Sequence, residues 1–155
     1  MKNIHIFDLD DCIIMHHGRK VRYDKIIENP FLTYYLNLCD GEKYIYTNGT
    51  YDHANDILNK MKIHDKFKKI YSRDTVNTMK PDTNSALDVQ DDIISIEKTK
   101  NNNYIFYDDQ IDNLKAAKEI GWKTVWIHPK YYYYKKYSFI DDAYSNLTNA
   151  LRNKV

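Results

Sequence analysis

Acidic side chains gather directly after two short apolar runs of this sequence. Asp8, Asp10 and Asp11 follow the first run, and Asp108 and Asp109 follow another run much later in the chain. Carboxylates that lie close together repel one another, so they stay ionised only when a cation offsets their charge. Oxygen ligands without a Cys or His partner favour Mg²⁺, which usually keeps waters and a phosphate oxygen in its shell. We therefore expect these acids to form a Mg²⁺ site.

Hydrogen-bond donors follow two further apolar runs. Thr47–Gly49 comes after one of them, and Lys80 stands before Pro81 beyond the other. Their N–H and O–H groups suit phosphate oxygens. Acids, a cation, a lysine and a hydroxyl are together typical of phosphoryl transfer, which depends on positioning and charge neutralisation. Alternation along an extended chain places Asp8 and Asp10 on one side, so that one carboxylate can attack phosphorus while the other moves protons.

Elements of regular structure must position these residues, and the five apolar, β-branched or aromatic runs predict strands. The runs are continuous rather than alternating, which is typical of strands that are buried on both faces of a parallel sheet. Apolar residues at helical spacing predict helices between the strands. The predicted strands are Ile4–Phe7, Tyr44–Tyr46, Lys69–Tyr71, Tyr104–Tyr107 and Thr124–Ile127, and the predicted helices are Pro30–Leu38, Tyr51–Met61, Asp82–Val89 and Ile111–Ile120.

Alternating strands and helices predict a doubly wound, three-layer α/β/α fold around a parallel sheet. Ligands of such sheets bind outside the carboxyl ends of the strands, which is where the acids, Thr47 and Lys80 are expected. A last helix is predicted over about residues 138–153, because Ser138 suits an N-cap. The apolar residues that would share one face of this helix are Ile140, Ala143, Tyr144, Leu147 and Leu151.

Length and composition exclude several classes of protein. The chain has 155 residues, which fits one domain over residues 1–155, and its formal charge of +1 gives no basic excess for generic nucleic-acid binding. Cys12 and Cys39 are too few for a disulfide framework, and we expect both to be small buried side chains. No apolar run is long enough for a membrane span, and Met1–Asp8 lacks a signal-peptide pattern, so we expect a cytoplasmic protein.

In their order and spacing, these motifs resemble those of the haloacid dehalogenase-like (HAD) superfamily. Asp8–Cys12 is similar to its first motif, DxDx[TV], with Cys12 in place of the usual Thr or Val. Thr47-Asn48 is similar to the second motif, Lys80-Pro81 to the third, and Asp108-Asp109 with Asn113 to the fourth. The resemblance spans roughly residues 4 to 128 and implies a Rossmannoid fold.

The resemblance implies a Mg²⁺-dependent phosphatase that forms an aspartyl-phosphate, with a role for each matching residue. Asp8 would be the nucleophile and a metal ligand. Asp10 would be the general acid and base, with its main-chain carbonyl on the metal. The other implied roles are binding of the phosphoryl group by Thr47, Asn48 and Gly49, charge neutralisation in catalysis and substrate binding by Lys80, and metal binding by Asp108 and Asp109.

The interval between Asp10 and Thr47 is short for this superfamily, many members of which insert a helical cap domain there. It has room for a flap over about residues 12–24 and for one helix, so we expect no sizeable cap. Finer similarity over Thr47–Ala54 and Gly121–Trp126 points to the pyrimidine 5′-nucleotidase-type branch. That branch implies a nucleotide or another small phosphate as the substrate.

Several alternatives stay open for the substrate and the partners. An open site also suits a macromolecular phosphate, such as a nucleic-acid end or a phosphoprotein, and it suits an oligomer in which a neighbouring subunit closes the site. A phosphotransferase or phosphomutase would use the same motifs. A binding module that keeps the fold without turnover is a different class of alternative, but the presence of both Asp8 and Asp10 argues against it.

Other residues have both a structural and a functional interpretation. The basic flap residues either meet the leaving group of a substrate or form a solvated hairpin; they are His16, His17, Arg19 and Lys20. Tyr131–Tyr134, with lysines on both sides, is expected to be a loop into the last helix, with base stacking or a dimer contact as alternatives. His53 is expected on a helix face, and Trp122 and Trp126 in the core or at its edge.

Overall fold

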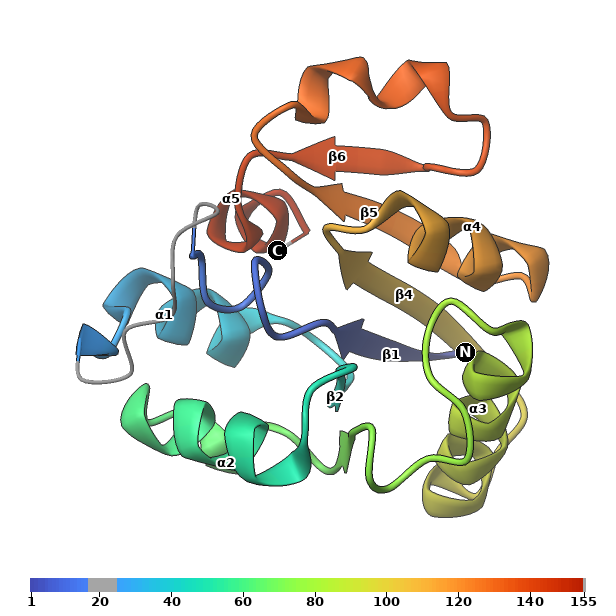
Figure 1. Cartoon of the computed structure of the whole chain (residues 1–155), viewed down its shortest axis with the longest axis horizontal. Coiled ribbons are helices and arrows are strands. Elements are labelled where there is room, and N and C mark those ends of the chain that lie inside the picture. The colour runs from blue at the N-terminus through green and yellow to red at the C-terminus, as the bar shows by residue number, and fades with distance from the viewer. Residues whose placement is uncertain (17–24, 155) are drawn as a thin grey trace.

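The computed structural model describes residues 1–16 and 25–154 and has an α/β fold (Figure 1). Its sheet has six strands in the order β3-β2-β1-β4-β5-β6, and every neighbouring pair is parallel. The predicted doubly wound fold is therefore confirmed. The strands are β1 (Lys2–Phe7), β2 (Glu42–Tyr46), β3 (Ile70–Tyr71), β4 (Asn102–Asp108), β5 (Lys123–Ile127) and β6 (Asp142–Tyr144).

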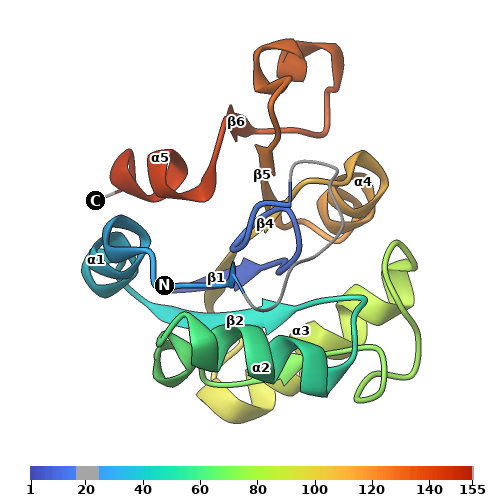
Figure 2. The ribbon, with the colours of Figure 1, turned by 60° about the vertical axis from the view of Figure 1, so that its left-hand side comes forward.

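Helices cover both faces of the sheet and complete the three layers. One face carries α1, α2 and α5, and the other carries α3 and α4 (Figure 1). The turned view shows α1 lying beside α5 (Figure 2). The helices are α1 (Pro30–Leu38), α2 (Tyr51–Lys60), α3 (Thr83–Glu97), α4 (Ile111–Glu119) and α5 (Leu147–Arg152), with the short 3-10 helices η2 (His64–Lys66) and η3 (Tyr131–Lys136).

Two apolar clusters form the core, one on each face of the sheet. Successive strand residues point to opposite faces. Ile4 and Ile6 of β1 therefore pack with α3 and α4, whereas Phe7 packs with α1, α2 and α5. Trp122 and Trp126 are buried beside α3 and α4, as predicted. Since both faces are covered, the strands need apolar residues at consecutive positions, which explains their continuous apolar runs.

Local sequence signals set the ends of most helices. Asn29 caps α1 through a hydrogen bond from the N–H of Leu32, and Pro30 occupies the first turn. Asp82 caps α3 in the same way, and this helix continues to Glu97, well beyond the predicted end at Val89. The predicted strands all form, with ends that shift by one to a few residues.

The predicted helix over residues 138–153 is wrong. The structure has the edge strand β6 within this segment, and only the short helix α5 follows it. Ile140 and Ala143 pack on the face with α3 and α4, whereas Leu147 and Leu151 pack on the opposite face. These residues therefore do not share one helical stripe. The Tyr131–Tyr134 run correspondingly leads into β6, as part of η3, and not into a helix.

The flap over about residues 12–24 lies largely outside the described residues, because residues 17–24 are not described. Its first part is a tight turn in which the N–H groups of Cys12 and Ile14 both donate to the carbonyl of Leu9. No cap domain is present among the described residues between β1 and β2, where α1 is the only α-helix. No helix of the described chain is long and apolar enough to cross a membrane.

The strand order reverses at β1 and β4, and this reversal creates the site. From β1 the chain winds outward through β2 to β3, and then returns to the other side of β1 as β4. Neighbouring crossovers that diverge leave a crevice at the carboxyl ends of the two central strands. The register pairs Phe7 with Tyr107, so the residues that follow them, Asp8 and Asp108, emerge side by side.

Candidate active site

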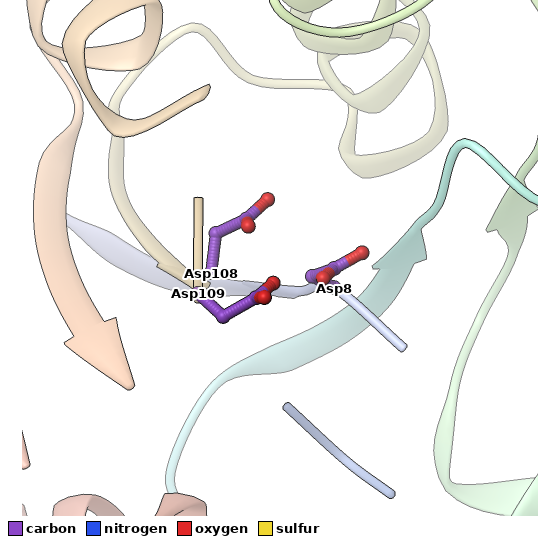
Figure 3. A group of neighbouring side chains, drawn as sticks. All are labelled: Asp8, Asp108 and Asp109. Carbon is purple, nitrogen blue, oxygen red and sulfur yellow. The ribbon is translucent and has the colours of Figure 1, made fainter. Parts of the chain in front are cut away.

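Three carboxylates converge where β1 and β4 end. Asp8 follows β1, and Asp108 and Asp109 lie at the end of β4 (Figure 3). One oxygen from each carboxylate lies within 4.8 Å of the others. Asp108 is fully buried, and Gln110 N–H and Asn113 Nδ2 both donate hydrogen bonds to its carboxylate. An all-oxygen donor set of this kind fits a hard divalent cation, which would neutralise the negative charge gathered here.

Lys80 links the acids to one another. Its Nζ donates to Asp8 Oδ1 at 3.0 Å, to Asp108 Oδ2 at 2.8 Å and to the carbonyl of Tyr46 at 2.9 Å. These three bonds use the three hydrogens of the ammonium group. The same Nζ lies over the rings of Tyr46 and Phe106, at 5.0 and 5.4 Å from their centroids. The surroundings of Lys80 therefore hold one buried positive charge directly between two carboxylates.

Electrostatics explain why a cation suits this cluster. Burial raises the pKa of Asp8 well above its ordinary value, and repulsion by Asp108 adds to the effect, while Lys80 opposes it. Burial and then Asp108 raise the pKa of Asp109 to about 6. Burial alone would lower the pKa of Lys80, but the carboxylates of Asp108 and Asp8 outweigh it and raise that pKa. One lysine thus leaves the three acids short of positive charge.

The loop after β2 faces the acids across a small cavity. Thr47 is buried, and its Oγ1 accepts a hydrogen bond from Gly49 N–H at 3.0 Å, which leaves the hydroxyl hydrogen available to a ligand. Asn48 uses its side chain differently: its amide bonds to the backbone of Lys80 at both N–H and C=O. The cavity has a volume of about 190 Å³ and is lined by Asp8, Asp10, Asp11, Thr47, Asn48, Gly49, Lys80, Asp109, Gln110 and Asn113.

A second, larger cavity of about 810 Å³ lies between α1 and α5. It shares no lining residue with the first cavity, and its described lining contains no carboxylate and no lysine. Size alone therefore does not identify the site, and the acidic cavity is the candidate active site on chemical grounds.

Asp10 lies at the same cavity but outside the three-carboxylate cluster. The intervening Leu9 is fully buried, so Asp8 and Asp10 face the same side, as alternation predicts. The carboxylate of Asp10 contacts two histidine rings, through His16 Nε2 at 2.7 Å and His53 Nε2 at 3.1 Å. An acid that is held apart from the metal-ligand set is free to exchange protons with a bound ligand.

All of the residues predicted for the site come together around this one cavity except Asp108, which lies buried directly behind it. His17, Arg19 and Lys20 fall outside the described residues. Cys12 and Cys39 are buried, as predicted, and burial raises the pKa of both thiols. A buried thiol with a raised pKa is a poor nucleophile.

Sequence reasoning missed two features of the site. His53 does lie on a helix, in the first turn of α2, but its ring reaches Asp10. Its position in the first turn of the helix that follows Thr47–Gly49 was a usable signal. Asn48 was expected to help hold a phosphoryl group, and its side-chain contact with Lys80 joins segments that are far apart in the sequence. Nothing local predicts that contact.

Comparison with known proteins agrees with this geometry. The family model of the haloacid dehalogenase-like hydrolases matches residues 35–127, more than half of the chain. No curated protein sequence matches the chain. Among solved structures, the NMR structure of a core domain from Streptococcus pneumoniae TIGR4, named as that of a phosphoglycolate phosphatase, has a TM-score of 0.66 at 15% identity. The match covers 99% of this chain and 95% of that domain.

Two longer proteins are also similar in structure. The HAD-hydrolase YfnB from Bacillus subtilis, solved bound to magnesium, has a TM-score of 0.61 at 16% identity, over 81% of this chain and 52% of that one. A HAD phosphatase from Thermococcus onnurineus has a TM-score of 0.61 at 22% identity, over 80% and 54%. This chain thus spans about half of the length of these two relatives, and such identities establish the fold alone. The matching family model does more, and it shows that the chain belongs to the haloacid dehalogenase-like hydrolases.

Proposed function

We propose that the protein is a Mg²⁺-dependent phosphatase that hydrolyses a phosphate monoester through an aspartyl-phosphate on Asp8. The observation that carries the proposal is the position of Lys80, whose Nζ bridges Asp8 and Asp108 inside the acid cluster. A nucleophilic carboxylate must approach a phosphate that is itself negative, so its surroundings must hold positive charge. Lys80 supplies one charge, and the donor set of Asp8, Asp108 and Asp109 suits Mg²⁺ as the second.

In the first half of the reaction, a carboxylate oxygen of Asp8 attacks phosphorus in line, and the bond from phosphorus to the leaving oxygen breaks. Asp10 donates its proton to that oxygen, so the product leaves as an alcohol. Thr47 and the N–H groups of its loop would bind the phosphoryl oxygens, and Lys80 would offset the negative charge of the phosphoryl group and Asp8. Bound Mg²⁺ would supply further charge neutralisation at the phosphoryl group.

In the second half, the carboxylate of Asp10 takes a proton from water. The resulting hydroxyl attacks phosphorus, the bond from phosphorus to Asp8 breaks, and inorganic phosphate leaves. Asp8 is regenerated as a carboxylate, and Asp10 is protonated for the next turnover. A base that is ready for water favours hydrolysis over transfer to another acceptor, which is why we propose a phosphatase rather than a phosphotransferase or phosphomutase.

We infer that the substrate is a nucleotide or another small phosphate monoester, as the similarity to the pyrimidine 5′-nucleotidase-type branch suggests. The cavity of about 190 Å³ has room for a phosphoryl group and little more. The remainder of the substrate would therefore lie outside it. A macromolecular phosphate remains the alternative, because no cap domain covers the site among the described residues.

The test is to assay the purified protein with Mg²⁺ and to compare it with the Asp8→Asn variant. We expect the wild-type protein to hydrolyse p-nitrophenyl phosphate, and the variant to lose this activity while it keeps its circular dichroism spectrum. Full activity of the variant would overturn the mechanism. A parallel screen should include nucleotides, sugar phosphates, phosphopeptides and oligonucleotides with a terminal phosphate. Absence of turnover on all of them, in a folded protein that binds Mg²⁺, would favour the binding module.

A further inference from the structure

The carboxylate of Asp10 is held by two histidines that come from different parts of the fold. His16 Nε2 lies 2.7 Å from Oδ1, and His53 Nε2 lies 3.2 Å from Oδ1 and 3.1 Å from Oδ2. Whenever Asp10 is ionised, its carboxylate only accepts hydrogen bonds, so in that state each ring presents its Nε2–H to Asp10. Both rings are largely covered, with 11% of the His16 side chain and 19% of the His53 side chain exposed.

His53 is fixed by the start of α2. Its N–H donates to Oγ1 of Thr50, which caps the helix, so the backbone of His53 is anchored in the first turn. The ring lies against Gly49, where an added Cβ would come within 3.1 Å of His53 Cδ2. The phosphoryl-binding loop thus leaves space for this ring. The contact ties Asp10 to the same segment that carries Thr47.

His16 is fixed by the turn that follows β1. Its N–H donates to Oδ1 of Asp11 at 2.8 Å, and Asp11 itself has a left-handed backbone with a φ of 57°. An isolated parallel β-bridge between Asp10 and Ile14 closes the same turn. The backbone that carries Asp10 and the ring that holds its carboxylate therefore form one compact unit.

We propose that His16 and His53 are positioning residues that hold the carboxylate of Asp10 in the orientation for proton transfer, an inference that rests on the proposed phosphatase function. The Asp10 side chain is 37% exposed, and the two histidine rings contact its carboxylate. Without them, its two side-chain torsions would sample several rotamers. Proton transfer requires the carboxyl within hydrogen-bond reach of the leaving oxygen, so this freedom would slow the step.

This role makes a specific kinetic prediction, because substrates differ in how much they need the proton. The leaving group of an alkyl phosphate is a strongly basic alkoxide, unless Asp10 protonates its oxygen. p-Nitrophenyl phosphate releases a weakly basic phenolate, which leaves readily without a proton. Loss of Asp10 positioning should therefore harm the alkyl phosphate far more. The ratio kcat/KM is the right quantity, because it reports the steps up to departure of the leaving group and not the later hydrolysis of the aspartyl-phosphate.

The experiment compares two substrates by kcat/KM. One is a nucleoside 5′-monophosphate, or another alkyl phosphate that the protein hydrolyses, and the other is p-nitrophenyl phosphate. The variants are His16→Ala, His53→Ala and the double variant, with Asp10→Asn as the upper limit. We expect each single variant to lose about 10-fold on the alkyl phosphate and less than about 3-fold on p-nitrophenyl phosphate. His16→Gln and His53→Gln, whose amide can replace the Nε2–H donor, should recover most of the loss.

Two controls separate positioning from general damage. His64→Ala removes a histidine from η2, away from the cavity lining, and should leave kcat/KM unchanged for both substrates. Mg²⁺ affinity, measured by calorimetry, should stay unchanged in the His16 and His53 variants, because their contacts are with a carboxylate outside the three-acid cluster. Equal losses on both substrates, or no recovery with Gln, would overturn the inference. A wild-type protein that is folded, binds Mg²⁺ and hydrolyses no phosphate monoester of the screen described above would overturn the proposed function, and this inference with it.

Discussion

The side-chain amide of Asn48 holds the backbone of Lys80 at both of its polar groups. Nδ2 of Asn48 donates to the Lys80 carbonyl at 3.0 Å, and Oδ1 accepts from the Lys80 N–H at 3.0 Å. Lys80 lies at the end of a long loop after β3, and it begins the cis peptide bond to Pro81. Asn48 thus couples the loop after β2 to the residue that bridges Asp8 and Asp108.

We expect Asn48→Ala to lower kcat about 10-fold, because the Lys80 backbone would lose two hydrogen bonds and its ammonium would be positioned less precisely between Asp8 and Asp108. Asn48 is itself exposed, so the substitution removes hydrogen bonds rather than core packing, and stability should fall by only about 1 kcal/mol. Steady-state kinetics and urea unfolding measure the two effects. Asn48→Asp keeps the acceptor for the Lys80 N–H and should be intermediate. Asn59→Ala, which removes an exposed amide from α2, is the matched control, and an equal loss of kcat there would contradict the explanation.

Mg²⁺ should stabilise the protein more strongly as the pH rises from 5 to 8. Burial and Asp108 raise the pKa of Asp109 from 3.8 to about 6, so protons compete with the metal below that pH. In the metal-free protein the sign is opposite: stability due to protonated Asp109 is present below pH 3.8 and is lost as the pH rises through about 6. Thermal unfolding with Mg²⁺ and with EDTA, at each pH, measures the difference in Tm.

Asp109→Asn is the matching variant for this prediction. It removes one of the three carboxylates and one of the two whose pKa is raised, so its Mg²⁺-dependent gain in Tm should be smaller than that of the wild-type protein and should depend less on pH. Its metal-free form should be more stable than the wild-type protein at pH 8, because one repulsive charge is gone. A wild-type gain in Tm that is the same at pH 5 and pH 8 would show that Asp109 does not titrate in this range.

The residues at the ends of the central strands were predictable from the sequence, for a physical reason. A strand that is buried on both faces needs a continuous apolar run, so the first polar residue after it marks the edge of the sheet. Asp8 and Asp108 both stand at such points, and the parallel register then brings them together. The parallel type of the sheet and the carboxyl ends of its two central strands were therefore encoded by short-range pattern.

The remaining features depend on contacts between distant segments. Ala143 and Tyr144 pack on opposite faces of the sheet, which is the alternation of a strand, yet β6 has only three residues. Such a length is too short for a period of two to be distinguished from the 3.6-residue period of a helix. Pairing with β5 decides the outcome. The contacts of His53 with Asp10 and of Asn48 with Lys80 likewise exist only once the chain has folded.

Glu97→Gln should destabilise the protein at neutral pH and should destabilise it clearly less at pH 3. Burial would raise the pKa of Glu97, but hydrogen bonds from Tyr44, Lys68 and Lys2 outweigh it and lower the pKa to about 2. Because the folded pKa is below the usual 4.5, the stabilisation is present above pH 4.5 and is lost as the pH falls toward 2. The two lysines are about 40% exposed, and after allowance for solvent screening we expect a loss of about 2 kcal/mol at pH 7.

Urea unfolding at pH 7 and at pH 3 measures this effect. The wild-type protein should lose more stability between the two pH values than Glu97→Gln does. Glu119→Gln, at the exposed end of α4, is the control and should follow the wild-type protein at both pH values. If Glu97→Gln showed the same pH dependence as the wild-type protein, its carboxylate would not be the group that these three donors stabilise.

Gly41→Ala should be among the most destabilising single changes outside the site, with a loss of about 3 kcal/mol or more. Gly41 has a φ of +84°, which L residues rarely adopt, and an added Cβ would lie 2.1 Å from the carbonyl oxygen of Asn3. That oxygen belongs to the backbone of β1, so it can move only if the start of the sheet moves with it.

Gly121→Ala separates the steric clash from the backbone strain, because Gly121 has a φ of +89° but an added Cβ there would have nothing within 4 Å. Gly121→Ala should lower the free energy of unfolding by only about 1 kcal/mol, from backbone strain alone. Equal losses for the two variants in urea unfolding would mean that β1 yields to the clash and that the close approach of Gly41 does not constrain the sheet.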